Sequence, residues 1–405
     1  MLFLLALTPR LHSAITLGWH WDAPGSFTLV NFDEGGSCRA ALEGFGYSGF
    51  IGQQTIALAA LTDNAPQPAI RGNAPAVKAY CHGVEHMRVA RVYSAILGAL
   101  TTVVLVLVGF LLLPAQPAVG WIAGGVLAVS GFHISESMVA TVDAASTFFI
   151  YLFLLVMIYA ASSGRRAALW LSPLLLVPAV WTKFWVFALF AYVAVIPRRL
   201  YDYVAGGMSH RRMAVVILAT ALVFGALSNS DFRAAGLYPL LALYYLVIPW
   251  RTIPPPKIVI WLLVPAGAYL LCRLDLIATY TKGGMQGGFG PSYAAIGWHK
   301  WLRNLLNVPL VLIVGLGLPA FLFMLVGLRR LIAGVDNPRA WLCLTPLLMF
   351  ALFMGFVAPV TYYRHYLPLL PAAALIAAWG LYGTPWGKRP WFLMLFFAWP
   401  ALLAL

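Results

Sequence analysis

The sequence predicts an all-α integral membrane protein that crosses the bilayer about thirteen times, within a range of about 11–13. Composition supports this fold class, because 62% of the 405 residues are hydrophobic and only 9% are charged. In soluble domains, roughly a quarter of all residues are charged. Apolar runs of bilayer-spanning length also recur along the chain, with polar loops between them. We expect one integral domain over residues 1–405, since no long internal repeat is visible.

The net charge of +14 does not indicate a nucleic-acid partner. The basic residues form short clusters between apolar runs instead of gathering on one amphipathic element. The four cysteines have no metal-binding spacing, and no metal ligand set is predicted. Cys38 and Cys81 share the first polar loop. Two unpaired thiols are the favoured interpretation of this pair, and a disulfide is the alternative.

The elements are predicted in order from hydrophobic run length. The first run, about residues 1–18, is short for a bilayer that needs roughly 20 apolar residues, which suggests that the chain starts upstream of Met1. No cleavable signal peptide is predicted, because a basic n-region is missing. Residues 20–91 form a long first extracytoplasmic loop with helices on the membrane surface, and 273–304 form a second large outer loop. The remaining spans are 92–113, 119–132, 144–163, two arms of 167–197, 213–228, 235–250, 258–272, 305–328, 340–358, 366–383 and 391–405.

The charges of the loops fall on two sides when these spans alternate across the membrane. The short loops of one side carry paired Arg and Lys residues and only two of the twelve acids, Asp202 and Asp336. By the positive-inside rule that side is cytoplasmic. The other acids lie in longer loops. We therefore expect a multi-pass protein of the cell inner membrane with its active site on the extracytoplasmic side.

Asp33 and Glu34 form an acidic pair in the first outer loop. Adjacent side chains point in different directions, so one carboxylate is expected to react and the other to support it. A partly desolvated carboxylate at the mouth of a helix bundle suits a general base. A solvated loop pair is the alternative. Asp143 opens an apolar span, where it either assists the reaction or stabilises the helix N-terminus.

Two cationic positions on the outer side are candidates for binding an anionic group. Lys183 interrupts an apolar hairpin and needs a counter-ion, either a lipid phosphate or Asp143. Arg364 lies beside Tyr363 and His365, in a cluster that also fits an interfacial aromatic belt with a snorkelling arginine.

Five short segments stand out by their order and spacing. They are Phe32-Asp33-Glu34-Gly35, His86-Met87-Arg88-Val89-Ala90-Arg91-Val92-Tyr93-Ser94-Ala95-Ile96-Leu97-Gly98, Ala140-Thr141-Val142-Asp143-Ala144, Trp181-Thr182-Lys183 and Arg364-His365-Tyr366-Leu367-Pro368-Leu369-Leu370-Pro371. In that order they resemble motifs of the polytopic glycosyltransferases of the GT-C fold. The similar family is that of the dolichyl-phosphate-mannose protein mannosyltransferases, with bacterial relatives that include the lipid A aminoarabinose transferase. The chain departs from the family at Gly35-Gly36, where relatives often carry aromatic residues.

The resemblance implies transfer of a hexosyl or pentosyl group from a polyprenyl-phosphate donor to a lipid, glycan or protein acceptor. It implies catalytic roles for Asp33, Glu34 and Asp143, and donor-phosphate binding by Lys183, Arg364, Tyr363 and His365. No cofactor is assigned. Because metal need varies within the fold, a divalent metal stays open.

A transporter or flippase for a lipid or polar solute is the alternative function. Transporters place ionisable groups at mid-membrane on broken helices and often contain inverted repeats. In this sequence the ionisable groups collect on one side and no repeat is visible, which favours the enzyme.

Overall fold

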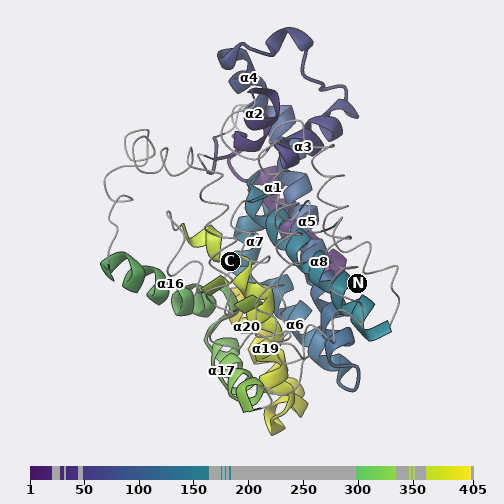
Figure 1. The fold of residues 1–405 in the computed structure, drawn as a ribbon, viewed down its shortest axis with the longest axis vertical. Coiled ribbons are helices and arrows are strands. Elements are labelled where there is room, and N and C mark those ends of the chain that lie inside the picture. The colour runs from purple at the N-terminus through teal and green to yellow at the C-terminus, as the bar shows by residue number, and fades with distance from the viewer. Residues whose placement is uncertain are drawn as a thin grey trace, which may run out of the picture.

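The structure is a computed structural model of the 405-residue chain. It describes residues 1–20, 28–31, 33–43, 49–163, 298–333 and 362–402, with single positions at 175, 178, 182, 183, 346, 347, 350 and 351. Helices form its secondary structure within these ranges, without a β-strand, which agrees with the predicted all-α class. Figure 1 shows a bundle of long helices with a cap of short helices, α2 to α4, at one end of the long axis.

Helix α5, Val84–Leu112, is the longest described element, with 29 residues. At a rise of 1.5 Å per residue it extends about 44 Å, whereas the hydrocarbon core of a bilayer is about 30 Å thick. The helix begins at Val84 and not at residue 92, as run length predicted. Its charged first turns are helical because Gly83 starts the helix and Glu85 favours the N-terminal end of the dipole. These turns reach the cap.

Among the described residues, α5 alone is long and apolar enough to cross a membrane as one straight helix. Two bent pairs would each add one crossing if a pair counts as one span. The first pair joins α6, Pro117–Val129, to α7, Gly131–Ser137, at 62°. The second joins α16, Trp298–Leu316, to α17, Leu318–Ala333, at 120°. The count of about thirteen spans stays a prediction.

The predicted span over 305–328 is not one straight helix, because the chain turns sharply at Gly317. Its φ is +82°, a left-handed conformation that favours glycine, and a Cβ there would lie 2.4 Å from Cδ1 of Trp399. Pro319 then sits in the first turn of α17, where proline is tolerated. Residues 298–304, predicted as the end of the second outer loop, are helical. The rest of that loop lies outside the described residues.

Four further apolar helices occupy predicted spans. They are α1, Leu2–Thr16; α8, Val142–Ser163; α19, Leu369–Tyr382; and α20, Pro390–Leu402. The spans predicted at 167–197, 213–228, 235–250, 258–272 and 340–358 lie outside the described residues, apart from the single positions given above.

Tyr151 connects α8 to the start of α19. Its hydroxyl donates to the carbonyl oxygen of Pro368 and accepts from the N–H of Ala372, both at 2.9 Å. The first N–H groups of a helix have no partner within the helix, so this hydroxyl stabilises the end of α19. The short helix η7, Tyr363–Tyr366, comes immediately before that end. The position of η7 against α8 is thereby fixed.

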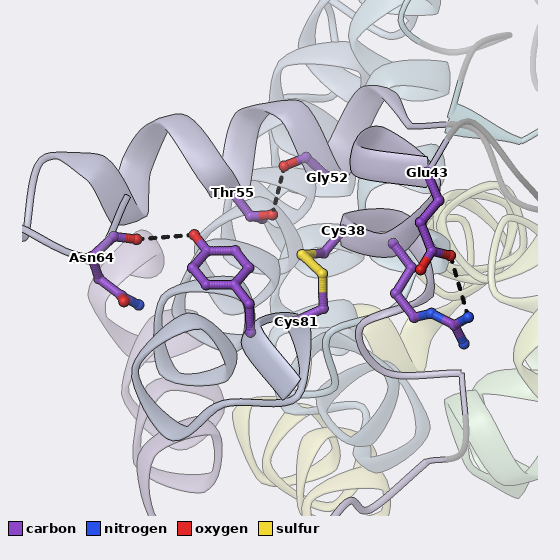
Figure 2. Close-up of a disulfide and its surroundings, with 8 residues drawn as sticks. Cys38, Glu43, Gly52, Thr55, Asn64 and Cys81 are labelled. Carbon is purple, nitrogen blue, oxygen red and sulfur yellow. Dashed lines mark hydrogen bonds and ion pairs between the residues drawn. A yellow bond between two sulfur atoms is a disulfide. The ribbon is translucent and has the colours of Figure 1, made fainter. Parts of the chain in front are cut away.

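The cap consists of α2, Gly36–Glu43; α3, Phe50–Ala60; η1, Pro68–Ile70; and α4, Ala74–Cys81. A disulfide between Cys38 and Cys81 joins α2 to α4, with the two Cα atoms 5.6 Å apart (Figure 2). The two sulfurs and Val77 form a small core of their own. The preference for two unpaired thiols was therefore wrong. Cap residues 43 positions apart are brought together here, and sequence spacing alone does not reveal such a pairing.

Candidate functional site

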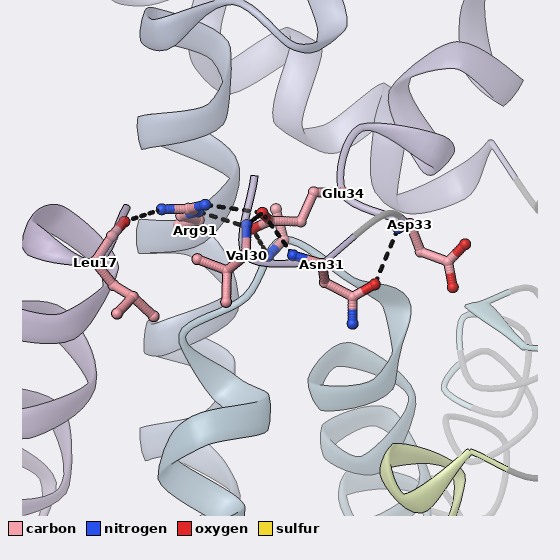
Figure 3. Close-up of polar contacts among 7 residues, drawn as sticks. Leu17, Val30, Asn31, Asp33, Glu34 and Arg91 are labelled. Atoms are coloured by element: carbon pink, nitrogen blue, oxygen red, sulfur yellow. Dashed lines mark hydrogen bonds and ion pairs between the residues drawn. The ribbon is translucent and has the colours of Figure 1, made fainter. Parts of the chain in front are cut away.

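Glu34 and Arg91 form a buried, two-point ion pair between the first outer loop and α5. Arg91 Nε donates to one carboxylate oxygen at 2.7 Å and Nη2 to the other at 2.8 Å, and both side chains are at most 1% exposed. Arg91 Nη1 also donates to the carbonyl oxygen of Leu17 at the end of α1, at 2.5 Å. Figure 3 shows this arginine between the α1 end and the acidic loop. The pair therefore joins α1, the loop and α5.

Backbone N–H groups complete the surroundings of the Glu34 carboxylate. Val30 and Asn31 donate to it at 3.0 and 3.4 Å. Ala140, in the turn between α7 and α8, donates at 3.1 Å. A carboxylate engaged in this way is held in one place. Glu34 thus fixes the α7–α8 turn relative to the acidic loop.

The side chain of Asp33 points away from Arg91 (Figure 3). Its own N–H donates to Oδ1 of Asn31 at 2.9 Å, which stabilises the turn. Its carboxylate is paired with the Nη2 group of Arg364, from η7. Asp33 is 15% exposed and Arg364 is 7% exposed at the side chain, so the pair is largely removed from solvent.

Arg364 also reaches Asp143, with Nε 3.5 Å from Oδ2. Its guanidinium lies over the ring of Tyr362, 4.5 Å from the centroid, in a cation–π contact. Asp143 stands in the first turn of α8 and is also paired with Lys183. The structure therefore brings Asp33, Asp143, Lys183 and Arg364 together, and it provides the counter-ion that the sequence suggested for Lys183.

The two other predicted phosphate-binding residues lie differently. Tyr363 is 55% exposed. His365 is buried, and its ring meets the ring of Tyr362 edge-on with centroids 5.3 Å apart. They flank Arg364 in the chain, and they contribute an exposed aromatic surface and a packed aromatic pair.

Gly35 forms the contact between the acidic turn and the cap. Its φ is +80°, and a Cβ at this position would lie 2.5 Å from Cδ2 of His82 and 3.0 Å from the carbonyl oxygen of Cys81. Only glycine accommodates both the left-handed φ and this close approach. Burial lowers the pKa of His82, and the positive charges of Lys78 and Arg39 lower it further.

Two residues near the site had no predicted role. Arg91 belongs to one of the family-like segments, but its partner cannot be identified from the sequence because the two positions are 57 residues apart. Glu136, in α7, interacts electrostatically with both Arg364 and Lys183. Glu136 lies in a short polar patch between two apolar spans, and this position is the feature of the sequence that could have identified it as a site residue. Within the described ranges, no group of three or more His, Cys, Asp or Glu side chains could hold a metal ion.

The fold and the site define a class: an all-helical protein with apolar helices and a buried cluster of opposite charges where the cap meets the bundle. Solved structures of the same fold come from the oligosaccharyltransferase of Archaeoglobus fulgidus. The apo form matches all of this chain with a TM-score of 0.61 and 12% identity, and the complex of AglB with an inhibitory peptide and a dolichol-phosphate matches with 0.62 and 12%. The form tethered to an acceptor peptide gives 0.57 and 13%.

This chain spans about half of the length of those structures, between 53% and 54%. The structural match shows a shared fold, and at 12–13% sequence identity it shows the fold alone. No protein-family model matches the sequence. No curated protein matches it either.

Proposed function

We propose that the protein is an integral-membrane glycosyltransferase that transfers a glycosyl group from a polyprenyl-phosphate-linked donor to an acceptor. The observation that carries the proposal is the buried cluster of Asp33, Asp143, Lys183 and Arg364. Ionised groups are costly in an apolar bundle, and an assembly of four from distant segments indicates a functional site. The shared fold with an oligosaccharyltransferase that binds a dolichol-phosphate supports a lipid-linked donor.

Arg364 and Lys183 are suited to bind the donor phosphate. Both cations are held by carboxylates, and Arg364 is paired with Asp33. A phosphate offers a guanidinium the same two-point, charge-assisted hydrogen bonds as a carboxylate, with more acceptor oxygens and up to two negative charges, so it can compete with Asp33 for Arg364. Binding of the donor would therefore replace Asp33 at Arg364. The released carboxylate is then available to the acceptor.

In the transfer step, the bond between the anomeric carbon and the phosphate oxygen breaks, and its electron pair leaves with the polyprenyl phosphate. Arg364 and Lys183 stabilise the negative charge that grows on this leaving group. The acceptor heteroatom bonds to the anomeric carbon, and its proton passes to Asp33. Asp143 orients the two cations. We assign Glu34 a positioning role in place of the predicted catalytic one, because its carboxylate is already engaged by Arg91.

We place this reaction at the extracytoplasmic face of the cell inner membrane. The cap carries a disulfide, and disulfides persist in oxidising compartments outside the cytoplasm. The distribution of Arg and Lys among the short loops supports the same orientation. The acceptor, whether lipid, glycan or protein, would approach from that side.

The test measures glycosyl transfer in membranes from a panel of radiolabelled polyprenyl-phosphate sugars, at matched expression. Asp33→Asn should lower transfer roughly 10²–10⁴-fold, the usual contribution of a general base. Asp63→Asn is the matched control. Asp63 is an exposed cap residue with φ of 58°, a conformation that asparagine also adopts, so transfer should be unchanged.

Equal transfer by wild type and Asp33→Asn would overturn the role of Asp33. Absence of transfer by the wild type from every donor in the panel would favour a transporter or flippase instead. Uptake or flipping of the same labelled lipids in proteoliposomes then distinguishes that alternative.

A further inference from the structure

A small cavity lies where the cap meets the bundle, next to the turn that carries Asp33 and Glu34. Its volume is about 20 Å³. Cap residues of α2 and α3 form one wall, including Ser37 and Ile51, and α5 and the residues just before α8 form the other. Among the described residues that line it, a histidine is the one acidic or basic side chain.

Three residues that line this cavity each carry a polar atom without a hydrogen-bond partner among the described residues. The atoms are Nδ1 of His86, Oγ of Ser94 and Oγ1 of Thr141. The three residues are 1%, 4% and 7% exposed, respectively. Buried polar groups in folded proteins are almost always hydrogen-bonded, to the protein or to ordered water. Three such atoms around one cavity indicate a common ligand.

We propose that the cavity is an internal water site, in which one water molecule bridges α5 and the α7–α8 turn. A cavity needs about 10–15 Å³ to hold a water, and the water needs two to four polar partners. The cavity meets both conditions, with room for one water and three partners. The water can donate to Nδ1 of His86 and accept from the hydroxyls of Ser94 and Thr141. A bound cation is disfavoured because the described lining residues include no carboxylate.

This water would be the second anchor of the turn that precedes Asp143. The first anchor is the Glu34 carboxylate, which accepts from the N–H of Ala140. The adjacent Thr141 lines the cavity, and Asp143 follows two residues later. The water site is thus placed to hold the Asp143 end of the charged cluster. The proposal of a water site depends on the cavity and its buried polar atoms, and not on the proposed reaction.

The direct test is an experimental map of the full chain in a lipid nanodisc, at a resolution that shows ordered waters. The wild-type map should contain a peak within hydrogen-bond distance of at least two of the three atoms. Thr141→Val, which replaces the hydroxyl by a methyl group of similar size, should weaken that peak, because it leaves two of the three partners. Thr101→Val is the matched control, because the equally buried Thr101 hydroxyl donates to Leu97 of its own helix. It should leave the peak in place.

A double-mutant cycle in unfolding measurements gives a second test. If one water joins Ser94 and Thr141, the combination of Ser94→Ala with Thr141→Val should destabilise little more than the larger single change. The pair of Ser94→Ala and Thr101→Val should be additive. If Thr141→Val does not fold, Thr141→Ser replaces it, and its map must retain the peak. A map in which His86, Ser94 and Thr141 bond directly to one another, or additive effects of Ser94 and Thr141, would overturn the proposal.

Discussion

Asp33 and Glu34 are neighbours in the chain, yet their carboxylates are paired with arginines that are 273 positions apart, as the numbers 91 and 364 show. Glu34 is fully buried against Arg91, and Asp33 reaches Arg364 from the opposite side of the turn. One acid of the pair therefore fixes the loop, and the other presents a carboxylate to the candidate site. The two adjacent acids thus have different surroundings, which leads to different expectations for each.

Removal of the Glu34 charge should destabilise the protein. Glu34→Gln leaves Arg91 as a buried cation without its counter-ion, and breaking such a pair costs about 3–5 kcal/mol. Glu85→Gln is the matched control, because Glu85 forms an exposed pair with Arg88 at 3.4 Å, and exposed pairs contribute about 0–1 kcal/mol. Denaturant unfolding in detergent measures both. Similar losses of unfolding free energy in the two variants would contradict the structural role of the Glu34–Arg91 pair.

Reduction of the Cys38–Cys81 disulfide should loosen the cap. A disulfide of this kind typically contributes about 2–4 kcal/mol, and this one closes a loop of 43 residues. Thermal unfolding of the wild type should shift downward on addition of a reductant. The double variant Cys38→Ser/Cys81→Ser should start at the lower midpoint and show no further shift. If the reductant lowered the midpoint of the double variant by the same amount, the effect would not come from the Cys38–Cys81 disulfide.

A methyl group on Gly35 should disturb the acidic turn. Gly35→Ala combines a left-handed φ, which costs about 1–2 kcal/mol for other residues, with a clash against the His82 ring. Gly72→Ala is the control, since Gly72 has φ of +82° and no heavy atom within 4 Å of the added Cβ. The difference between the two losses in unfolding free energy isolates the contact. Equal losses of unfolding free energy in the two variants would show that the contact of Gly35 with His82 does not contribute.

Stability should fall on acidification because of His82. Its pKa is lower in the folded protein than in the unfolded chain, so the unfolded state binds the proton first as the pH falls. The contribution is complete above the unfolded pKa of about 6.5 and decreases below it. The unfolding midpoint of the wild type should therefore drop more between pH 7.5 and pH 5.5 than that of His82→Gln. The same drop in both proteins would assign the pH dependence to other groups.

The predictable part of the fold follows from apolar run length. Helices α5, α8 and α19 lie at predicted spans because a bilayer demands long apolar segments. The break at Gly317 was missed, since glycine and proline lie within an apolar run and hydropathy does not register a reversal of direction. The early start of α5 was missed because its first turns carry charges. Hydropathy does not register that Glu34 neutralises Arg91 from a distant part of the chain.

The site could be anticipated only as a set of residue types. Asp33, Asp143, Lys183 and Arg364 stand out as charges beside apolar runs, and the structure brings the four together. Which carboxylate faces which cation depends on the direction of the turn at Gly35 and on the position of η7. Neither is encoded in local spacing. The same holds for the disulfide, whose partners meet only when α2 and α4 pack.

In the proposed mechanism, Asp33 competes with the donor phosphate for Arg364 before it acts as the base. The most direct test of this competition is the affinity of the purified protein for polyprenyl phosphate, measured beside transfer for wild type, Arg364→Gln and Asp33→Asn. We expect weaker binding by Arg364→Gln. We expect equal or tighter binding by Asp33→Asn, together with transfer that is roughly 10²-fold or more slower. Loss of phosphate binding in Asp33→Asn, or binding by Arg364→Gln that equals wild type, would contradict the competition between Asp33 and the phosphate.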